Sequence, residues 1–294
     1  MRNSPIRLQL TGGLGNQLFS YAAALLMAQK TGRTLIIDSS VSERVFKRKP
    51  DLFEFRLCGE SRVTLNQIAK SDIFLDRLFW KFNLSRKLTS RYQSPVLGDD
   101  RKIFESSSIK YLRGFFQTKK NPEIVRENIG FEWAELRTPS ANFLELAKKL
   151  ENQQVIGLHV RRGDYRNYSN EFGLLSSRYY EEAINTLSTQ LPDSQLWLFS
   201  DEPSLVVKEF NDAQISFAYV ANESDLSPAE TLIIMSKLSG LVIANSTFSW
   251  WAAFLSKGQV VAAPKPWFKN EGSWLKEDSL IPKHWFRCKS DWTH

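Results

Sequence analysis

The residues best suited to chemistry lie in the string HVRRGDY, residues 159–165. Arg161 and Arg162 follow an apolar run and stand just before a glycine. Guanidinium groups are planar, permanently charged and able to bind phosphate through two hydrogen bonds at once. The pair could therefore neutralise a diphosphate before and after one of its bonds breaks. The alternative interpretation is a surface salt-bridge cluster at the end of a strand.

Two neighbours of the arginines could take part in the same chemistry. Asp164 could pair with one arginine and fix its conformation, or it could act as a general base. His159 falls inside the apolar run, where a lone histidine is more often a packed, hydrogen-bonded residue than a ligand. Both interpretations of each residue stay open at this point.

A second string, ANSTFSWWAAFL at residues 244–255, predicts a helix whose first turn could bind an anion. Asn245, Ser246 and Thr247 precede the apolar part of the string. The start of a helix offers unpaired backbone N–H groups and the positive end of the helix dipole. Ser246 or Thr247 could also serve only as the N-cap, and the two roles are compatible. We assign the two adjacent tryptophans to the core or to a domain interface rather than to sugar binding.

A glycine-rich turn near the start of the chain is the third candidate. Gly12, Gly13 and Gly15 follow a short apolar run, and Asn16 and Gln17 come at the start of a predicted helix. Glycines allow the backbone to approach a ligand or a neighbouring element closely. We expect Asn16 and Gln17 to face a cleft.

The same turn has a competing interpretation as a dinucleotide fingerprint. Gly13, Gly15 and a carboxylate after the next strand, Asp38, have suitable spacing. The third glycine of that fingerprint falls on Leu18, where close packing of helix and strand requires a small residue. The fingerprint is therefore weak, although an NAD-binding oxidoreductase stays an alternative.

The elements that position these residues alternate regularly in the second half of the chain. Strands are expected at 6–10, 35–37, within 111–117, and at 155–160, 196–200, 217–220, 241–244 and 260–263; helices are expected at 16–29, within 139–154, and at 177–187, 203–210, 228–237 and 247–256. Repeated β-α-β units indicate an α/β fold with parallel sheets and helices on both faces. Ligands of such sheets bind at the carboxyl ends of the strands, and Asp201 and the strings above fall there.

Length and composition narrow the class of protein. A chain of 294 residues favours two domains, which we place at residues 1–150 and 151–294. Two distant cysteines and three scattered histidines, without a D-x-D string, give little support to a disulfide framework or a metal site. No secretion signal or membrane span is expected. The net charge of +7 includes a basic segment, residues 77–91, which could contact anionic lipid or form a solvated helix face.

Four strings together resemble the bacterial α-1,2-fucosyltransferases, members of glycosyltransferase family 11. They are GGLGNQLFSYAAA, HVRRGDY, LWLFSDE and ETLIIMSKLSGLVIANSTFSWWAAFL, and the resemblance runs from about residue 6 to residue 270. It implies a GT-B fold with two facing Rossmann-like domains, the C-terminal one binding GDP-fucose and the N-terminal one on the acceptor side. The implied reaction is metal-independent transfer of L-fucose, with inversion, to the 2-hydroxyl of a terminal galactose.

The resemblance also implies roles for individual residues. Arg161 corresponds to the arginine that contacts the GDP phosphates, with Arg162 as its companion, and His159 would lie beside the nucleotide. Asp201 would lie on the nucleotide side, with Asn245, Ser246 and Thr247 near the phosphates, and Asn16 would face the transferred sugar. LRGFFQ at residues 112–117 departs from the family's more usual aromatic-rich G-Y-F-Q run, which leaves acceptor choice open.

We accordingly expect GDP-fucose as a substrate, no cofactor and no metal. The acceptor is expected to be a galactose-terminated oligosaccharide or a lipid-linked glycan, and no nucleic-acid partner is expected. Because the membrane anchor of vertebrate members is not seen in this sequence, a cytoplasmic enzyme is expected, with peripheral contact to an anionic membrane left open. Another sugar-nucleotide-dependent glycosyltransferase, or a non-catalytic module that binds nucleotide or glycan, remains an alternative.

Overall fold

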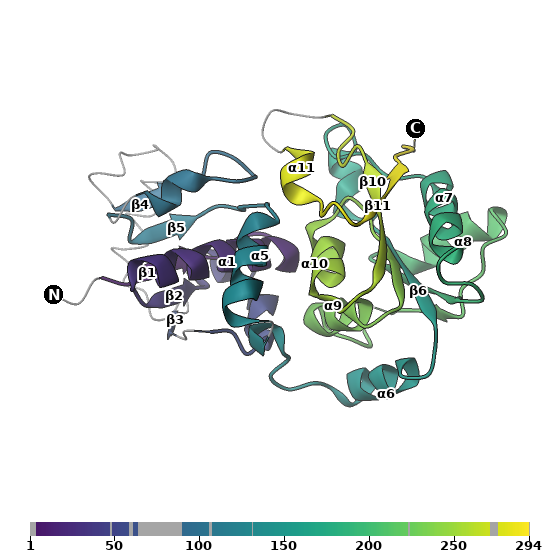
Figure 1. The fold of residues 1–294 in the computed structure, drawn as a ribbon, viewed down its shortest axis with the longest axis horizontal. Helices are drawn as coiled ribbons and strands as arrows, with labels where there is room; N and C mark the ends of the chain where they lie inside the picture. Colours follow the sequence, from purple (N-terminus) through teal and green to yellow (C-terminus); the bar gives the residue numbers. More distant parts are fainter. Residues whose placement is uncertain are drawn as a thin grey trace. The chain divides into compact units, whose positions relative to one another are not determined.

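The computed structural model describes residues 4–47, 49–58, 61–63, 90–105, 108–130, 132–222, 224–270 and 276–293. The chain divides into two compact units. Unit 1 comprises Met1–Arg137 and Trp274–Leu280, and unit 2 comprises Thr138–Ser273 and Ile281–His294. Each unit is built around a parallel sheet (Figure 1).

Unit 1 contains a five-stranded sheet in the order β3-β2-β1-β5-β4, and all its strand pairs are parallel. The strands are β1 (Ile6–Gln9), β2 (Leu35–Asp38), β3 (Ser61–Val63), β4 (Arg91–Gln93) and β5 (Tyr111–Arg113), and the helices are α1 (Leu14–Thr31), α2 (Ser40–Phe46), α5 (Lys120–Ile129) and α11 (Glu277–Leu280). Helix α1 is apolar and is buried along most of its length. It ends at Gly32, whose left-handed conformation lets its N–H bond the last carbonyls of the helix.

Unit 2 contains a six-stranded sheet in the order β11-β10-β9-β6-β7-β8, again with parallel pairing throughout. The strands are β6 (Val155–Val160), β7 (Gln195–Ser200), β8 (Tyr219–Val220), β9 (Gly240–Val242), β10 (Val260–Lys265) and β11 (Phe286–Lys289), and the helices are α6 (Ala141–Leu150), α7 (Ser177–Ser188), α8 (Pro203–Asp212), α9 (Pro228–Ser236) and α10 (Thr247–Leu255). Figure 1 shows α7 and α8 on one face of this sheet and α9 and α10 on the other. Strand β6 is buried at all six positions because it is central and covered on both faces.

Local signals explain several boundaries in unit 2. Helix α9 begins with a capping box, in which Ser227 and Glu230 satisfy each other's backbone N–H groups, and Pro228 occupies the first turn. Trp250 and Trp251 of α10 are fully buried, as expected for core residues. Trp250 stacks on Phe254 with their ring centroids 4.8 Å apart.

Both sheets reverse their strand order at one point, and this reversal positions the sites. In unit 1 the chain leaves β1 for β2 and β3 on one side, while β5 and β4 lie on the other. In unit 2 the corresponding point lies between β6 and β9. In parallel sheets, ligands typically bind outside the carboxyl ends of the strands at such a point.

The expected strands and helices are found, although β8 is shorter than the predicted 217–220. Strands β3, β4 and β11 and helices α2, α5 and α11 were not anticipated, and β11 pairs with β10. The four residues of β11, FRCK, alternate apolar and charged side chains, but a run of only four residues is a weak signal for a strand. Residues 77–89 of the basic segment lie outside the described residues.

Candidate active site

Arg161 lies at the carboxyl edge of the unit 2 sheet, immediately after β6. The register pairs Val160 with Ser200 of β7, so Arg161 comes level with Asp201. One guanidinium nitrogen of Arg161, Nη2, lies 2.6 Å from Asp164 Oδ1, and the other, Nη1, lies 3.0 Å from Asp201 Oδ2. The Arg161 side chain is still 31% exposed. Two carboxylates therefore fix a cationic group that remains accessible beside the switch point.

Arg162 has a different environment, because successive side chains of a strand point to opposite faces. It is 3% exposed, and its Nη2 lies 2.8 Å from Oε1 of Glu209 on α8, with a further bond from Nε to Oε2 of 3.2 Å. Its backbone N–H donates to Asp201 Oδ1 at 2.9 Å. The structure therefore separates the two arginines, which the sequence suggested as one phosphate-binding pair.

Asp201 connects the arginine segment to β7. It accepts from the Arg162 backbone through one oxygen and pairs with the Arg161 side chain through the other. The next residue along, Gly163, leaves room for this arrangement, since a Cβ there would lie 2.6 Å from Asp201 Oδ2. A larger residue at position 163 would have to displace the carboxylate that holds Arg161.

His159 is buried on the same face of the sheet as Arg161. Its ring lies 5.5 Å from the ring of Phe248, between centroids, and its Nδ1 has no hydrogen-bond partner among the described residues. Burial, and then the positive charge of Arg161, lower the pKa of His159 from 6.5 to about 3. The imidazole is therefore neutral at ordinary pH. The sequence predicted a packed, hydrogen-bonded histidine. His159 is packed as predicted, but its Nδ1 has no hydrogen-bond partner among the described residues.

The start of α10 faces the other side of the switch point. Ser246 is the N-cap, and its Oγ accepts from the Phe248 backbone N–H at 3.3 Å, while Thr247 is partly exposed. Asn245 is 2% exposed, and its Nδ2 donates to the Phe172 carbonyl at 2.8 Å. Asn245 was expected near the phosphates, and in the structure its amide anchors the loop that contains Phe172.

That loop runs from Asp164 to Gly173 and carries aromatic side chains. Tyr165 donates to the Asn245 carbonyl at 2.9 Å, and burial raises the pKa of its phenol above the ordinary value. The Arg161 guanidinium lies 5.8 Å from the Tyr165 ring centroid. The loop, β6 and the start of α10 are thus tied together around Arg161.

In unit 1, the residues predicted after β1 come together at its own switch point. Gly12 has φ +75, Gly13 is the N-cap of α1, and Gly15 is buried within that helix. The Asn16 Oδ1 accepts from Nε2 of Gln117 at 3.0 Å. Gln117 follows β5 and was not identified from the sequence as a site residue.

Gln17 and Asp38 do not present their polar groups to a ligand. Gln17 is 2% exposed, its Nε2 donates to the Gly12 carbonyl at 2.9 Å, and its Oε1 accepts from the Leu52 N–H at 3.2 Å. The expectation that Gln17 faces a cleft is therefore wrong. Asp38 is fully buried, and its Oδ1 accepts from the Ser40 N–H at 2.9 Å. Asp38 is thus not placed to bind a ribose, which removes the main support for NAD binding.

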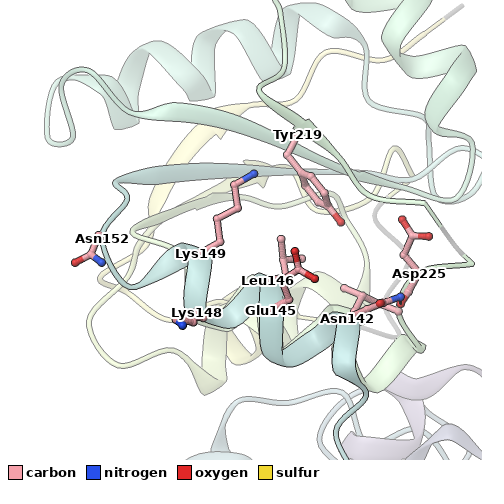
Figure 2. A pocket seen from close by; sticks show the side chains of 9 residues that line it. Asn142, Glu145, Leu146, Lys148, Lys149, Asn152, Tyr219 and Asp225 are labelled. Atoms are coloured by element: carbon pink, nitrogen blue, oxygen red, sulfur yellow. Dashed lines mark hydrogen bonds between the residues drawn. The ribbon is translucent and has the colours of Figure 1, made fainter.

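A separate groove of about 690 Å³ lies along α6 (Figure 2). Figure 2 shows Tyr219, Asp225 and Lys149 around it, and none of the predicted site residues is among the described residues that line it. Burial, and then the charge of Asp225, raise the pKa of Tyr219.

Within the described parts of the chain, no group of three His, Cys, Asp or Glu side chains could hold a metal ion. In the same residues, no helix combines the length and apolar character needed to cross a membrane.

Two parallel sheets with switch points, one of them flanked by an accessible arginine and a helix start, are typical of nucleotide-binding α/β proteins. The chain matches the model of glycosyl transferase family 11 over residues 5–288 and belongs to that family. It is a glycosyltransferase with a GT-B fold.

Relatives and solved structures agree with this assignment. The O-antigen biosynthesis glycosyltransferase WbnK of Escherichia coli is 31% identical, over 92% of this chain and 98% of the relative. An alpha-1,2-colitosyltransferase of Escherichia coli is 26% identical, over 96% and 98%. The galactoside 2-alpha-L-fucosyltransferase Sec1 of Mus musculus is 24% identical, over 88% and 67%. The crystal structure of fucosyltransferase NodZ from Bradyrhizobium superposes with a TM-score of 0.53 at 17% identity, covering 86% of this chain and 93% of that one.

Proposed function

We propose that the protein transfers L-fucose from GDP-β-L-fucose to the 2-hydroxyl of a terminal galactose, with inversion at the anomeric carbon. Family membership and relatives named as α-1,2-transferases support this reaction. The single observation that carries it is the Arg161 guanidinium, held by two carboxylates yet still accessible at the switch point of unit 2. In this proposal unit 2 binds the sugar nucleotide and unit 1 is on the acceptor side.

The chemistry needs charge stabilisation at the leaving group. The bond between C1 of fucose and the phosphate oxygen breaks, and its electrons leave with GDP. Arg161 would stabilise this charge, assisted by Thr247 and the N–H groups at the start of α10. Because its position is fixed before substrate arrives, Arg161 would need little reorganisation in the transition state.

The acceptor oxygen attacks C1 from the opposite side, and its proton must move to a base. Asp164 is the proposed base: its side chain is 60% exposed, and it contacts Arg161 at the edge of the site. The same contact supports its other role, which is to hold Arg161 in place. Asp164→Asn separates the two, because asparagine keeps an oxygen that accepts from Arg161 but cannot take a proton at neutral pH.

The neighbours of Arg161 have supporting roles in this proposal. His159 would lie beside the nucleotide as a neutral group, because its pKa is lowered to about 3. Arg162 would fix the path of the chain through Glu209 rather than bind phosphate. Asn245 would hold the aromatic loop from the far side of the switch point.

The acceptor and the cellular location are also proposals. The relative WbnK is named for O-antigen biosynthesis, which supports a bacterial surface glycan, free or lipid-linked, as the acceptor. We propose a cytoplasmic enzyme that can contact an anionic membrane, and metal-independent transfer.

The decisive experiment incubates the protein with GDP-fucose and lactose. Mass spectrometry should detect a fucosylated trisaccharide, and NMR should show an α-1,2 linkage. GDP-colitose is the parallel donor, because one relative is named as a colitosyltransferase and colitose lacks only one hydroxyl of fucose. Transfer of colitose without transfer of fucose would replace the proposed donor, and a linkage to another hydroxyl would overturn the proposed regiochemistry.

A further inference from the structure

Asn16 and Gln117 meet at the switch point of unit 1. The register pairs Leu8 of β1 with Leu112 of β5, so the chain leaves two adjacent strands at the same edge. From β1 it passes through Gly12 into α1, which brings Asn16 to the first turn, and from β5 it passes to Gln117. The two amide side chains are joined by a hydrogen bond of 3.0 Å.

This hydrogen bond has a defined direction. Gln117 Nε2 donates to Asn16 Oδ1, and the opposite oxygen, Gln117 Oε1, is buried without a partner. If both amides were reversed, the buried group without a partner would be the Gln117 NH₂. Buried N–H groups without partners are rarer than under-satisfied carbonyl oxygens, so the observed direction is the more stable one. Asn16 therefore keeps its NH₂ group available as a donor.

Space is left beside that donor. Asn16 is partly exposed, whereas Gln117 is only 6% exposed. A Cβ at Gly12 would lie 3.0 Å from Asn16 Nδ2, and the φ of +75 at Gly12 also favours glycine. The Ser20 Oγ lies 2.7 Å from the Asn16 carbonyl and 2.6 Å from the Gly114 carbonyl, which ties α1 to the segment after β5. The amide is thus fixed on one side and open on the other.

We propose that Asn16 Nδ2 donates a hydrogen bond to an oxygen of a bound sugar substrate, and that Gln117 is a positioning residue that sets the direction of the Asn16 amide. This inference rests on the proposed function. It adds a role for Gln117 and the direction of the hydrogen bond between Asn16 and the substrate. The group that Asn16 would bind is an oxygen that accepts a hydrogen bond. Either the sugar nucleotide or the acceptor glycan can provide such an oxygen.

Gln117→Glu is the sharpest test, because it changes hydrogen-bonding character with almost no change in shape. A carboxylate at position 117 accepts but does not donate, so it draws Asn16 Nδ2 toward itself and turns Oδ1 to the substrate. We expect kcat/KM to fall about tenfold or more. The melting temperature should fall as well, because position 117 is only 6% exposed and a carboxylate there is buried. Gln93→Glu is the matched control: it adds the same charge at an exposed glutamine of unit 1 and should leave kcat/KM unchanged.

A double-mutant cycle separates positioning from a general structural role. Asn16→Ala should also lower kcat/KM, and adding Gln117→Glu to Asn16→Ala should lower it no further, because Gln117 acts through Asn16. Full additivity, or wild-type kcat/KM in Gln117→Glu, would overturn the inference. A rise in KM for lactose alone would assign the bound oxygen to the acceptor. A rise in KM for GDP-fucose, together with slower hydrolysis without acceptor, would assign it to the donor.

Failure of the proposed function has a different signature. In that case the wild-type protein itself transfers no fucose, whatever the variants do. The cycle would then be measured with the GDP-sugar that the wild type does use, and additivity there would still refute the role of Gln117.

Discussion

Removing Glu209 should destabilise unit 2 strongly, although Glu209 lies outside the site itself. In Glu209→Ala, the Arg162 guanidinium, 3% exposed, loses the carboxylate with which it makes two hydrogen bonds through Nη2 and one through Nε. Breaking a buried ion pair by removing one partner typically costs about 3–5 kcal/mol. Because about 1 kcal/mol shifts the melting temperature of a unit of this size by about 2–4 °C, we expect a decrease of about 6–20 °C.

The assay is calorimetry or circular dichroism at neutral pH. Two variants provide controls. The first, Arg161→Ala, removes the neighbouring, partly exposed arginine and should shift the melting temperature by no more than about 2 °C. Arg162→Met/Glu209→Leu replaces the pair with apolar side chains and should recover most of the loss. A Glu209→Ala protein that melts within 2 °C of wild type would refute the view that Arg162 is a buried structural cation.

Four further predictions concern the site. Arg161→Ala should lower kcat by about 10² to 10³ while the fold is kept, and near-normal turnover in a GDP-release assay would contradict its role. The pKa of His159 is about 3 in the folded protein, below its unfolded value of 6.5. Its contribution to the free energy of unfolding is therefore fully present above pH 6.5 and is lost as pH falls. We expect about 2 kcal/mol less stability at pH 5 than at pH 7.5. His159→Gln should flatten that dependence in denaturant titrations, and an unchanged slope would show that other groups cause it. Asn245→Ala should remove one of two donors to the Phe172 carbonyl, leaving only the Lys269 N–H at 3.2 Å, and should speed proteolysis of residues 164–173; unaltered cleavage would refute the anchoring role. Activity should survive EDTA, whereas loss restored by Mg²⁺ or Mn²⁺ would contradict metal-independent transfer.

The parallel sheets and most of their helices could be predicted because apolar runs and amphipathic stretches alternate along the chain. The carboxyl-edge positions of Arg161, Asp201 and Ser246 followed from the same pattern, since ligands of parallel sheets bind at that edge. Strand β11 could not be predicted in this way. Its pairing with β10 depends on tertiary position, and the alternation of FRCK extends over only four residues, which is a weak signal.

The sequence also could not distinguish residues that face a ligand from those that support them. Arg161 and Arg162 are adjacent and chemically identical, yet the alternation of the backbone sends one toward the site and the other into the core against Glu209. Asn245 and Gln17 carry suitable groups at suitable places, but backbone partners from distant segments use those groups. Such partners depend on long-range packing, which no local pattern specifies. Gln117 was not predicted as a site residue for the same reason, because its partner Asn16 lies 101 residues away.

Unit 1 is built from two separate segments of the chain, and this has a consequence for how the protein is made. Helix α11 lies near the end of the chain but belongs to unit 1, where the Ser279 carbonyl accepts from the Lys119 N–H at 2.9 Å and from the Thr118 hydroxyl at 3.1 Å. Unit 1 is therefore incomplete on the ribosome until residue 280 has been synthesised. A single break after residue 137 leaves unit 1 without residues 274–280, so exchange of the two units between family members requires three crossovers rather than one.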